Sequence, residues 1–319
     1  KRQAWDGFAH HDTIFPLFLF IAGVSFPYSV AKQRAGGMSE GRIYAKIVRR
    51  GLTLVVLGMV YNGLFKLDFE NLRIASVLGR IGLAWSIAAV LYLNFGVKTR
   101  AAIAVAVLAG YGALSALVAA PDAAGAGPLT FEGNLAGYID RQFLPGKLIY
   151  GSFDPEGLLS TVPAVVTAML GMFTGEFVRR GDIRGGRKTL WMAAAAAALL
   201  AAGLAFSGVL PVNKKLWSST FVCVVGAYSL GMFALFYYLI DVRGWRRWTL
   251  FFRVVGLNSI TIYLAQRIVG FGRISDFFLG GIASKCPEAV AAVISSAGYV
   301  AVCWLFLYFL YRKNVFLKV

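Results

Sequence analysis

Nine long apolar runs constrain this chain more than any other feature of its sequence. Each run holds about 20 mostly apolar residues, which is the length an α-helix needs to cross a bilayer. Hydrophobic residues make up 58% of the chain and charged residues 15%, whereas soluble domains carry about 25% charged residues. We therefore predict an all-α, polytopic membrane helix bundle with about nine transmembrane helices. They cover residues 12–31, 46–65, 76–96, 101–119, 157–178, 189–209, 218–240, 249–270 and 289–311.

The loops between these runs alternate between a set rich in Lys and Arg and a poorer set. Because basic loops stay in the cytoplasm, the rich set predicts a cytoplasmic C-terminus and an outside N-terminus. An outside N-terminus predicts one more helix before Lys1. The expected location is a bacterial inner (cytoplasmic) membrane, crossed several times. The basic set comprises residues 32–45, 97–100, 179–188, 241–248 and the tail after Tyr311.

The whole chain, residues 1–319, is predicted to be a single transmembrane domain. Its longest outer loop, residues 120–156, is expected to form an ordered cap because it is rich in Pro, Gly and aromatic residues. The net charge of +17 follows the membrane orientation, so nucleic-acid binding is not expected. The cysteines have no CxxC spacing and no further His stands at ligand spacing, so neither a disulfide framework nor a metal site is predicted.

Several polar motifs fall at the outer ends of the predicted helices. Charged and amide groups near bilayer depth are costly unless they face a shared polar cavity. One outward-facing site is therefore expected. The motifs are Trp5-Asp6-Gly7, His10-His11-Asp12, Arg73 with Arg80, Asp154-Pro155-Glu156-Gly157, residues 211–217 and Gln266-Arg267.

Carboxylates in these motifs have two interpretations that the residues leave open. Asp154 and Glu156 precede a helix, so they either stabilise its N-terminus or face the cavity as a binding or acid-base pair. Asp12 either caps its helix or works with His10 and His11, because adjacent imidazole and carboxylate groups can deprotonate an amine or hydroxyl. The catalytic candidates are therefore Asp12, His10 and His11.

The predicted helix 249–270 carries Asn258, Ile262 and Gln266 on one face and Ser259 on the adjacent one. The amide and hydroxyl groups of these residues either form hydrogen bonds between helices or belong to the outward-facing site. The full set of substrate-binding candidates is Arg80, Asp154, Glu156, Asn213, Lys214, Trp217, Asn258, Ser259 and Gln266.

Read in order, the motifs resemble the heparan-alpha-glucosaminide N-acetyltransferase family, which includes bacterial members. Each motif is weak alone, whereas the ordered set at these separations is specific. The matching segments are Trp5-Asp6-Gly7, residues 12–16, 73–80, 137–141, 154–159 and 211–217, Asn258-Ser259 and residues 311–316.

The resemblance implies a membrane enzyme that moves an acetyl group from acetyl-CoA to the amine of an amino sugar or glycan on the far side of the bilayer. Asp12 matches the family's aspartate in this segment. The family's histidine lies three residues before the tryptophan, where this chain has Arg2. A homodimer is left open. Two other functions also stay open: an O-acyltransferase for a surface polysaccharide, and a solute transporter with an outward-facing polar site. The transporter would show inverted repeats and interrupted helices.

Overall fold

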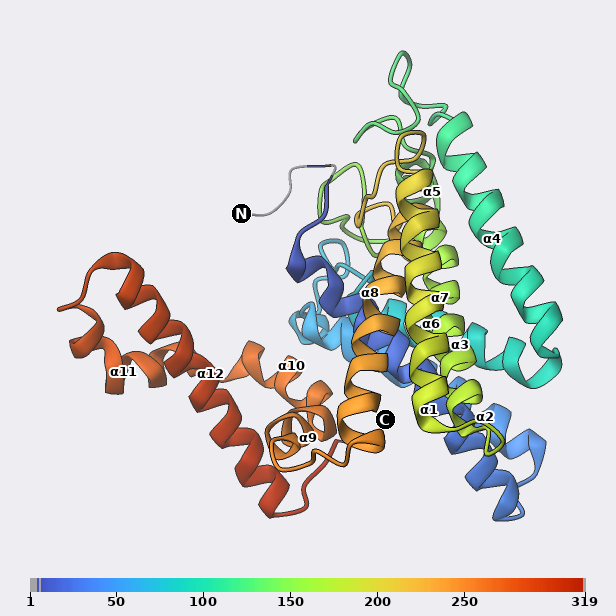
Figure 1. The fold of residues 1–319 in the computed structure, drawn as a ribbon. Helices are drawn as coiled ribbons and strands as arrows, with labels where there is room; N and C mark the ends of the chain where they lie inside the picture. The colour runs from blue at the N-terminus through green and yellow to red at the C-terminus, as the bar shows by residue number, and fades with distance from the viewer. Residues whose placement is uncertain (1–4, 6, 318–319) are drawn as a thin grey trace. The chain divides into compact units, whose positions relative to one another are not determined.

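The computed structural model describes Trp5 and residues 7–317; Arg2 and Asp6, which the sequence analysis singled out, lie outside the described residues. The regular elements within this part of the chain are all helical (Figure 1). The all-α prediction is therefore confirmed. By its internal contacts the chain forms two compact units, Lys1–Arg243 and Gly244–Val319, and each is described by itself. The prediction of one domain over residues 1–319 stays a prediction.

The first unit contains eight α-helices and three short helices of other types among the described residues. They are η1 (His10–Thr13), α1 (Ile14–Ala35), α2 (Glu40–Tyr61), η2 (Leu64–Lys66), α3 (Val77–Asn94), α4 (Val97–Leu117), α5 (Leu135–Phe143), α6 (Leu158–Arg179), α7 (Gly185–Ala205), α8 (Ser219–Tyr237) and η3 (Tyr238–Val242). The second unit contains α9 (Thr249–Leu257), α10 (Ser259–Ile268), α11 (Phe271–Ala283) and α12 (Glu288–Arg312).

Seven helical segments are long and apolar enough to cross a membrane among the residues that the structure describes. The protein is therefore a multi-pass membrane protein. The segments are His10–Ala35, Val77–Asn94, Val97–Leu117, Leu158–Arg179, Gly185–Ala205, Ser219–Val242 and Glu288–Arg312.

Two of the nine predicted spans are not among these seven segments. Of residues 46–65, only 46–61 fall in α2, which ends at Tyr61. The first half of α2 carries Arg42, Lys46, Arg49 and Arg50, too many charges for a typical span. The predicted helix 249–270 is wrong as a continuous element, because α9 ends at Leu257 and α10 begins at Ser259.

Asn258 is the point of interruption in the second unit. Its backbone leaves the helical region, with φ −123° and ψ 25°. Asn competes for backbone hydrogen bonds and so favours helix ends. Asn258 occupies the N-cap position of α10 without a side-chain cap hydrogen bond, and it does not share one face of an unbroken helix with Gln266.

Helix α6 is the centre of the first unit and contacts α1, α3, α4 and α8. Glycines let α1 and α6 approach closely. A β-carbon at Gly171 would lie 2.0 Å from the Phe20 carbonyl oxygen, and one at Gly175 would lie 2.2 Å from that of Val24. Small residues of this kind are the usual means of close helix packing in membranes. The loops that carry α5 gather beside the end of α4 (Figure 1).

Candidate functional site

A cavity of about 260 Å³ lies in the first unit, where three segments far apart in the sequence meet. The segments lead into the starts of α1, α6 and α8. Most of the predicted outer motifs contribute to its wall. The lining residues are Trp5, Gly7, His11, Asp12, Ile149, Tyr150, Pro155, Glu156, Lys214, Lys215 and Trp217.

Asp12 is the polar centre of this cavity. Its Oδ1 lies 3.0 Å from Lys214 Nζ and 3.2 Å from His11 Nε2. Its Oδ2 accepts a hydrogen bond of 3.0 Å from the backbone N–H of Ala9. The Asp12 side chain is 8% exposed, whereas that of His11 is 48% exposed. One oxygen of Asp12 therefore accepts the N-cap hydrogen bond of η1, and the other faces Lys214 and His11; its acid-base role stays a prediction.

The two adjacent histidines point to different places. The His10 ring packs edge-on against Tyr228 of α8, with 3.3 Å between Nε2 and the phenol oxygen. His10 does not line the cavity, whereas His11 does. The structure thus brings two of the three catalytic candidates together, Asp12 and His11.

The loop 211–217 is shaped by Asn213, which is fully buried. Its Oδ1 accepts hydrogen bonds from the backbone N–H groups of Lys215 and Leu216, at 2.8 and 3.0 Å. Its side-chain amide donates to the Trp5 carbonyl at 3.0 Å. Asn213 therefore orders the loop and ties it to the N-terminal segment, and its neighbours, not Asn213 itself, line the cavity.

Trp217 forms a buried part of the wall. Its φ of 52° lies in the left-handed region, which non-glycine residues rarely adopt. The indole N–H donates to Thr167 Oγ1 at 3.3 Å, and the ring packs against Phe15 with 4.9 Å between centroids. Close packing and one hydrogen bond hold this strained residue in place.

Lys215 covers the aromatic side of the cavity. Its Nζ lies 5.6 Å from the centre of the Trp5 ring and 5.3 Å from that of Tyr150. Such cation–π contacts keep an ammonium group beside the rings. Together with Lys214, it makes this wall cationic.

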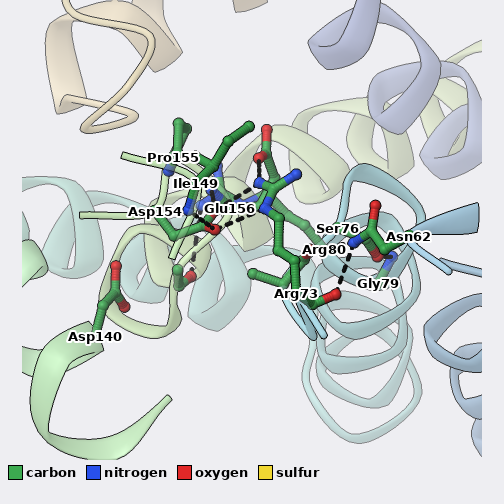
Figure 2. Close-up of polar contacts among 12 residues, drawn as sticks. Asn62, Arg73, Ser76, Gly79, Arg80, Asp140, Ile149, Asp154, Pro155 and Glu156 are labelled. Carbon is green, nitrogen blue, oxygen red and sulfur yellow. Dashed lines mark hydrogen bonds and ion pairs between the residues drawn. The ribbon is translucent and has the colours of Figure 1, made fainter. Parts of the chain in front are cut away.

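Arg73, Asp154 and Glu156 form an ion cluster next to the cavity (Figure 2). Arg73 Nε and Nη2 donate to the two oxygens of Asp154 at 2.7 and 2.6 Å, and Nη2 also binds Glu156. Burial alone would lower the pKa of Arg73, but the hydrogen bonds and charges of the two carboxylates outweigh it and raise that pKa.

Asp154 has no free oxygen for acid-base work. Besides Arg73, its oxygens accept from the backbone N–H groups of Glu156 and Ile149, at 2.9 and 3.3 Å, and its side chain is fully buried. Neither carboxylate caps α6 through its side chain. Asp154 therefore makes contacts within the protein and does not line the cavity, whereas Glu156 does; the role of both in substrate binding stays a prediction.

The cap of α6 comes instead from Asp140 on α5, whose Oδ1 accepts from Leu158 N–H at 2.8 Å. Gly157 is required here, because a β-carbon at this position would lie 1.9 Å from Asp140 Oδ2. Burial raises the pKa of Asp140 to about 6. Asp140 therefore fixes the outer loop to the start of α6.

Arg80 lies in the first turn of α3 and is 2% exposed. Its Nη2 donates to Ser160 Oγ and, at 3.5 Å, to the Gly157 carbonyl. The guanidinium carbon stands 5.0 Å from the centre of the Trp217 ring. Arg80 is thus one side chain behind the cavity wall.

Asn258, Ser259 and Gln266 belong to the second unit. Asn258 is buried and its Oδ1 accepts from Thr261 at 3.4 Å. Their assignment to the site stays a prediction.

Sequence reasoning did not select Arg73, Asp140, Tyr150 or Lys215 as site residues. Arg73 and Asp140 stood within recognised motifs, and Lys215 is adjacent to a selected lysine. Tyr150 carried no signal, because its place depends on how the outer loop folds.

These observations define a multi-pass membrane protein with a cavity that carries two lysines, two carboxylates and a histidine, at the end of the bundle where α1, α6 and α8 begin. No protein-family model matches the chain. Among curated proteins, it is 27% identical over 376 residues to heparan-alpha-glucosaminide N-acetyltransferase of Homo sapiens. It is 26% identical over 373 residues to the protein of the same name in Mus musculus.

Both alignments cover all of this chain and 56% of the relative, so the chain spans about half the length of the curated relatives it matches. The resemblance expected from the ordered motifs is confirmed. The similarity supports an acyltransferase-like function.

Proposed function

We propose that this chain is the membrane part of an acyltransferase that moves an acetyl group from acetyl-CoA to the amine of an amino sugar or glycan. The observation that carries the proposal is the cluster of Asp12, His11 and Lys214 on the cavity wall. The names of the relatives, both N-acetyltransferases, support the choice of reaction.

The cluster has the groups that acyl transfer to an amine requires. With His11 Nε2 donating to Asp12, Nδ1 of the neutral imidazole is free to accept a proton. Asp12 orients the ring and stabilises the imidazolium that forms. Lys214 holds a cation 3.0 Å from Asp12 Oδ1 and so fixes the position of that carboxylate.

The proposed acetyl transfer moves protons and electron pairs in three steps. The acceptor's ammonium group first loses one proton to water; the neutral amine then attacks the thioester carbon, and its nitrogen passes a second proton to His11 Nδ1. A C–N bond forms, the C–S bond breaks, and the departing thiolate takes the proton from the imidazolium. The products are the acetylated amine and the thiol of CoA.

The size of the cavity limits what it holds. Sites for drug-sized ligands measure about 300–1,000 Å³, whereas this cavity measures about 260 Å³. It accommodates the reacting ends of donor and acceptor, and the nucleotide end of CoA lies elsewhere. We propose that the cavity faces outward across a bacterial inner membrane, with the C-terminus in the cytoplasm.

One observation favours a second candidate, a solute transporter. Interrupted membrane helices often carry transport sites. The helical run that comprises α9 and α10 is interrupted at Asn258. Saturable uptake of a solute without any acetyl transfer would support this candidate.

The test uses radiolabelled acetyl-CoA and glucosamine with the full-length protein in proteoliposomes. His11→Gln should lower the transfer rate roughly a hundredfold or more, because it removes a positioned base. Asp12→Asn should show a similar loss at an unchanged Tm, since its amide oxygen can still accept from Ala9 N–H.

The matched control is His10→Gln, which changes the neighbouring histidine outside the cavity and should leave the rate nearly unchanged. Equal losses in the two histidine variants would contradict the assigned base. An acceptor with a hydroxyl in place of the amine, acetylated as fast as glucosamine, would favour the O-acyltransferase.

A further inference from the structure

Arg80 is a buried cation without an anionic partner. No carboxylate among the described residues lies within ion-pair distance of it, because Asp154 and Glu156 bind Arg73. Its Nη2 is satisfied by Ser160 and Gly157. Its Nε and Nη1 are buried and have no hydrogen-bond partner in the described part of the chain.

Such a group needs an explanation. Buried polar atoms in folded proteins are almost always hydrogen-bonded, and a buried charge is normally paired. Stacking on Trp217 satisfies the face of the guanidinium but not its N–H groups. An oxygen from a ligand would complete the set.

The position of Arg80 beside the cavity indicates which oxygen of a ligand it binds. Arg80 stands behind Trp217, and Trp217 lines the same cavity as His11 and Asp12. Ser160, in the first turn of α6, holds the guanidinium at that depth. The acceptor amine lies beside His11, so the carbonyl it attacks can present its oxygen to the wall that Arg80 supports.

We propose that Arg80 binds the carbonyl oxygen of the donor thioester and stabilises the oxyanion that forms when the amine attacks; this inference rests on the proposed acyl transfer. When the C–N bond forms, the electron pair of the C=O bond moves to oxygen, and a preorganised cation stabilises that charge best in a water-excluded site. The charge disappears when the carbonyl re-forms and the C–S bond breaks.

The first arm of the test measures binding and needs no turnover. S-ethyl-CoA is a thioether that lacks the carbonyl oxygen of acetyl-CoA. The full-length wild type should bind acetyl-CoA roughly tenfold more tightly than S-ethyl-CoA, as expected for a hydrogen bond to a charged group. Arg80→Lys should lose this preference, because an ammonium group does not reproduce the geometry of the guanidinium fork.

The second arm measures turnover. Arg80→Lys should lower kcat about 100- to 1,000-fold, the range for losing one oxyanion donor, with the acceptor KM and the Tm little changed. Methylguanidinium added to Arg80→Ala should restore part of the rate in a saturable way.

The matched control is Arg100→Lys. Arg100 is equally buried, at 4% exposed, and also has unpartnered Nε and Nη1 atoms, but it pairs with Glu176 near the opposite end of α6. Its replacement should leave both the preference for acetyl-CoA and kcat nearly unchanged.

The outcomes separate the two proposals. Normal kcat and an intact preference for acetyl-CoA in Arg80→Lys would overturn the role of Arg80 while acyl transfer stands. Loss of kcat with a parallel loss of Tm, and with the preference intact, would make Arg80 a structural residue. A wild type that transfers no acetyl group, yet prefers acetyl-CoA through Arg80, would overturn the proposed function and keep Arg80 as the carbonyl-binding residue.

Discussion

Replacing Arg73 by methionine should destabilise the first unit more than any exposed ion-pair change. Methionine keeps much of the length of the side chain but leaves Asp154 and Glu156 without a cation. Asp154 is fully buried, Glu156 is 13% exposed and Arg73 is 18% exposed. Removing one partner from a buried pair costs roughly 3–5 kcal/mol. Because Arg73 keeps some contact with solvent, we expect the lower part of that range.

The assay is thermal unfolding of the detergent-solubilised protein. A loss of about 3 kcal/mol corresponds to a fall in Tm on the order of 6–12 °C. The deficit should shrink at acidic pH, because protonation removes the repulsion between the two carboxylates. Adding Asp154→Asn and Glu156→Gln to Arg73→Met should recover much of the stability for the same reason.

The matched control is Arg180→Met, which breaks the pair with Asp182, where both side chains are more than half exposed. Exposed pairs of this kind contribute little, so the Tm should not change measurably. Equal Tm values for Arg73→Met and the wild type at neutral pH would refute the structural role of the cluster.

Two further predictions concern the outer loop. Burial raises the pKa of Asp140 to about 6 from 3.8, so the stability that this carboxyl contributes is full below about pH 4 and is lost as the pH rises through 6. Asp140→Asn does not titrate and should therefore be more stable than the wild type above pH 6, by at most about 3 kcal/mol; a difference that stays constant from pH 4 to 8 in unfolding midpoints would contradict this. In a background without native cysteines, an impermeant thiol reagent should label Ala124→Cys but not Gly186→Cys on intact cells, since both sites are exposed and their loops are predicted on opposite sides. Labelling of Gly186→Cys alone would reverse the orientation.

Hydropathy predicted most of the membrane helices because length and apolar content are properties of one segment at a time. It did not predict the end of α9 at Leu257, because Gly256, Asn258 and Ser259 leave the average apolarity of the run high while they favour a helix break. Hydropathy also did not predict that α2, because of its basic first half, differs from the apolar helices that can span a membrane.

Four of the six polar motifs contribute to one cavity, in agreement with their common position at the predicted outer ends of helices. The individual contacts inside the cavity were not predictable from the sequence. Successive residues in a 3₁₀ helix such as η1 point about 120° apart, so only one of His10 and His11 could face the cavity, and the sequence does not say which. The ion pair between Arg73 and Asp154 joins residues 81 positions apart in the sequence, and no local sequence pattern predicts such a contact.

The contact between Asp12 and Lys214 spans 202 positions of the chain, and this separation has a consequence for biosynthesis. Helix α1 is made before the rest of the bundle, but the groups that complete the site at its N-terminal end arrive only after α7 has been made. A ribosome-bound chain that stops before Asn213 can contain α1 to α7 and still lack the cavity. The site therefore appears late in synthesis, when the loop before α8 reaches the N-terminal segment.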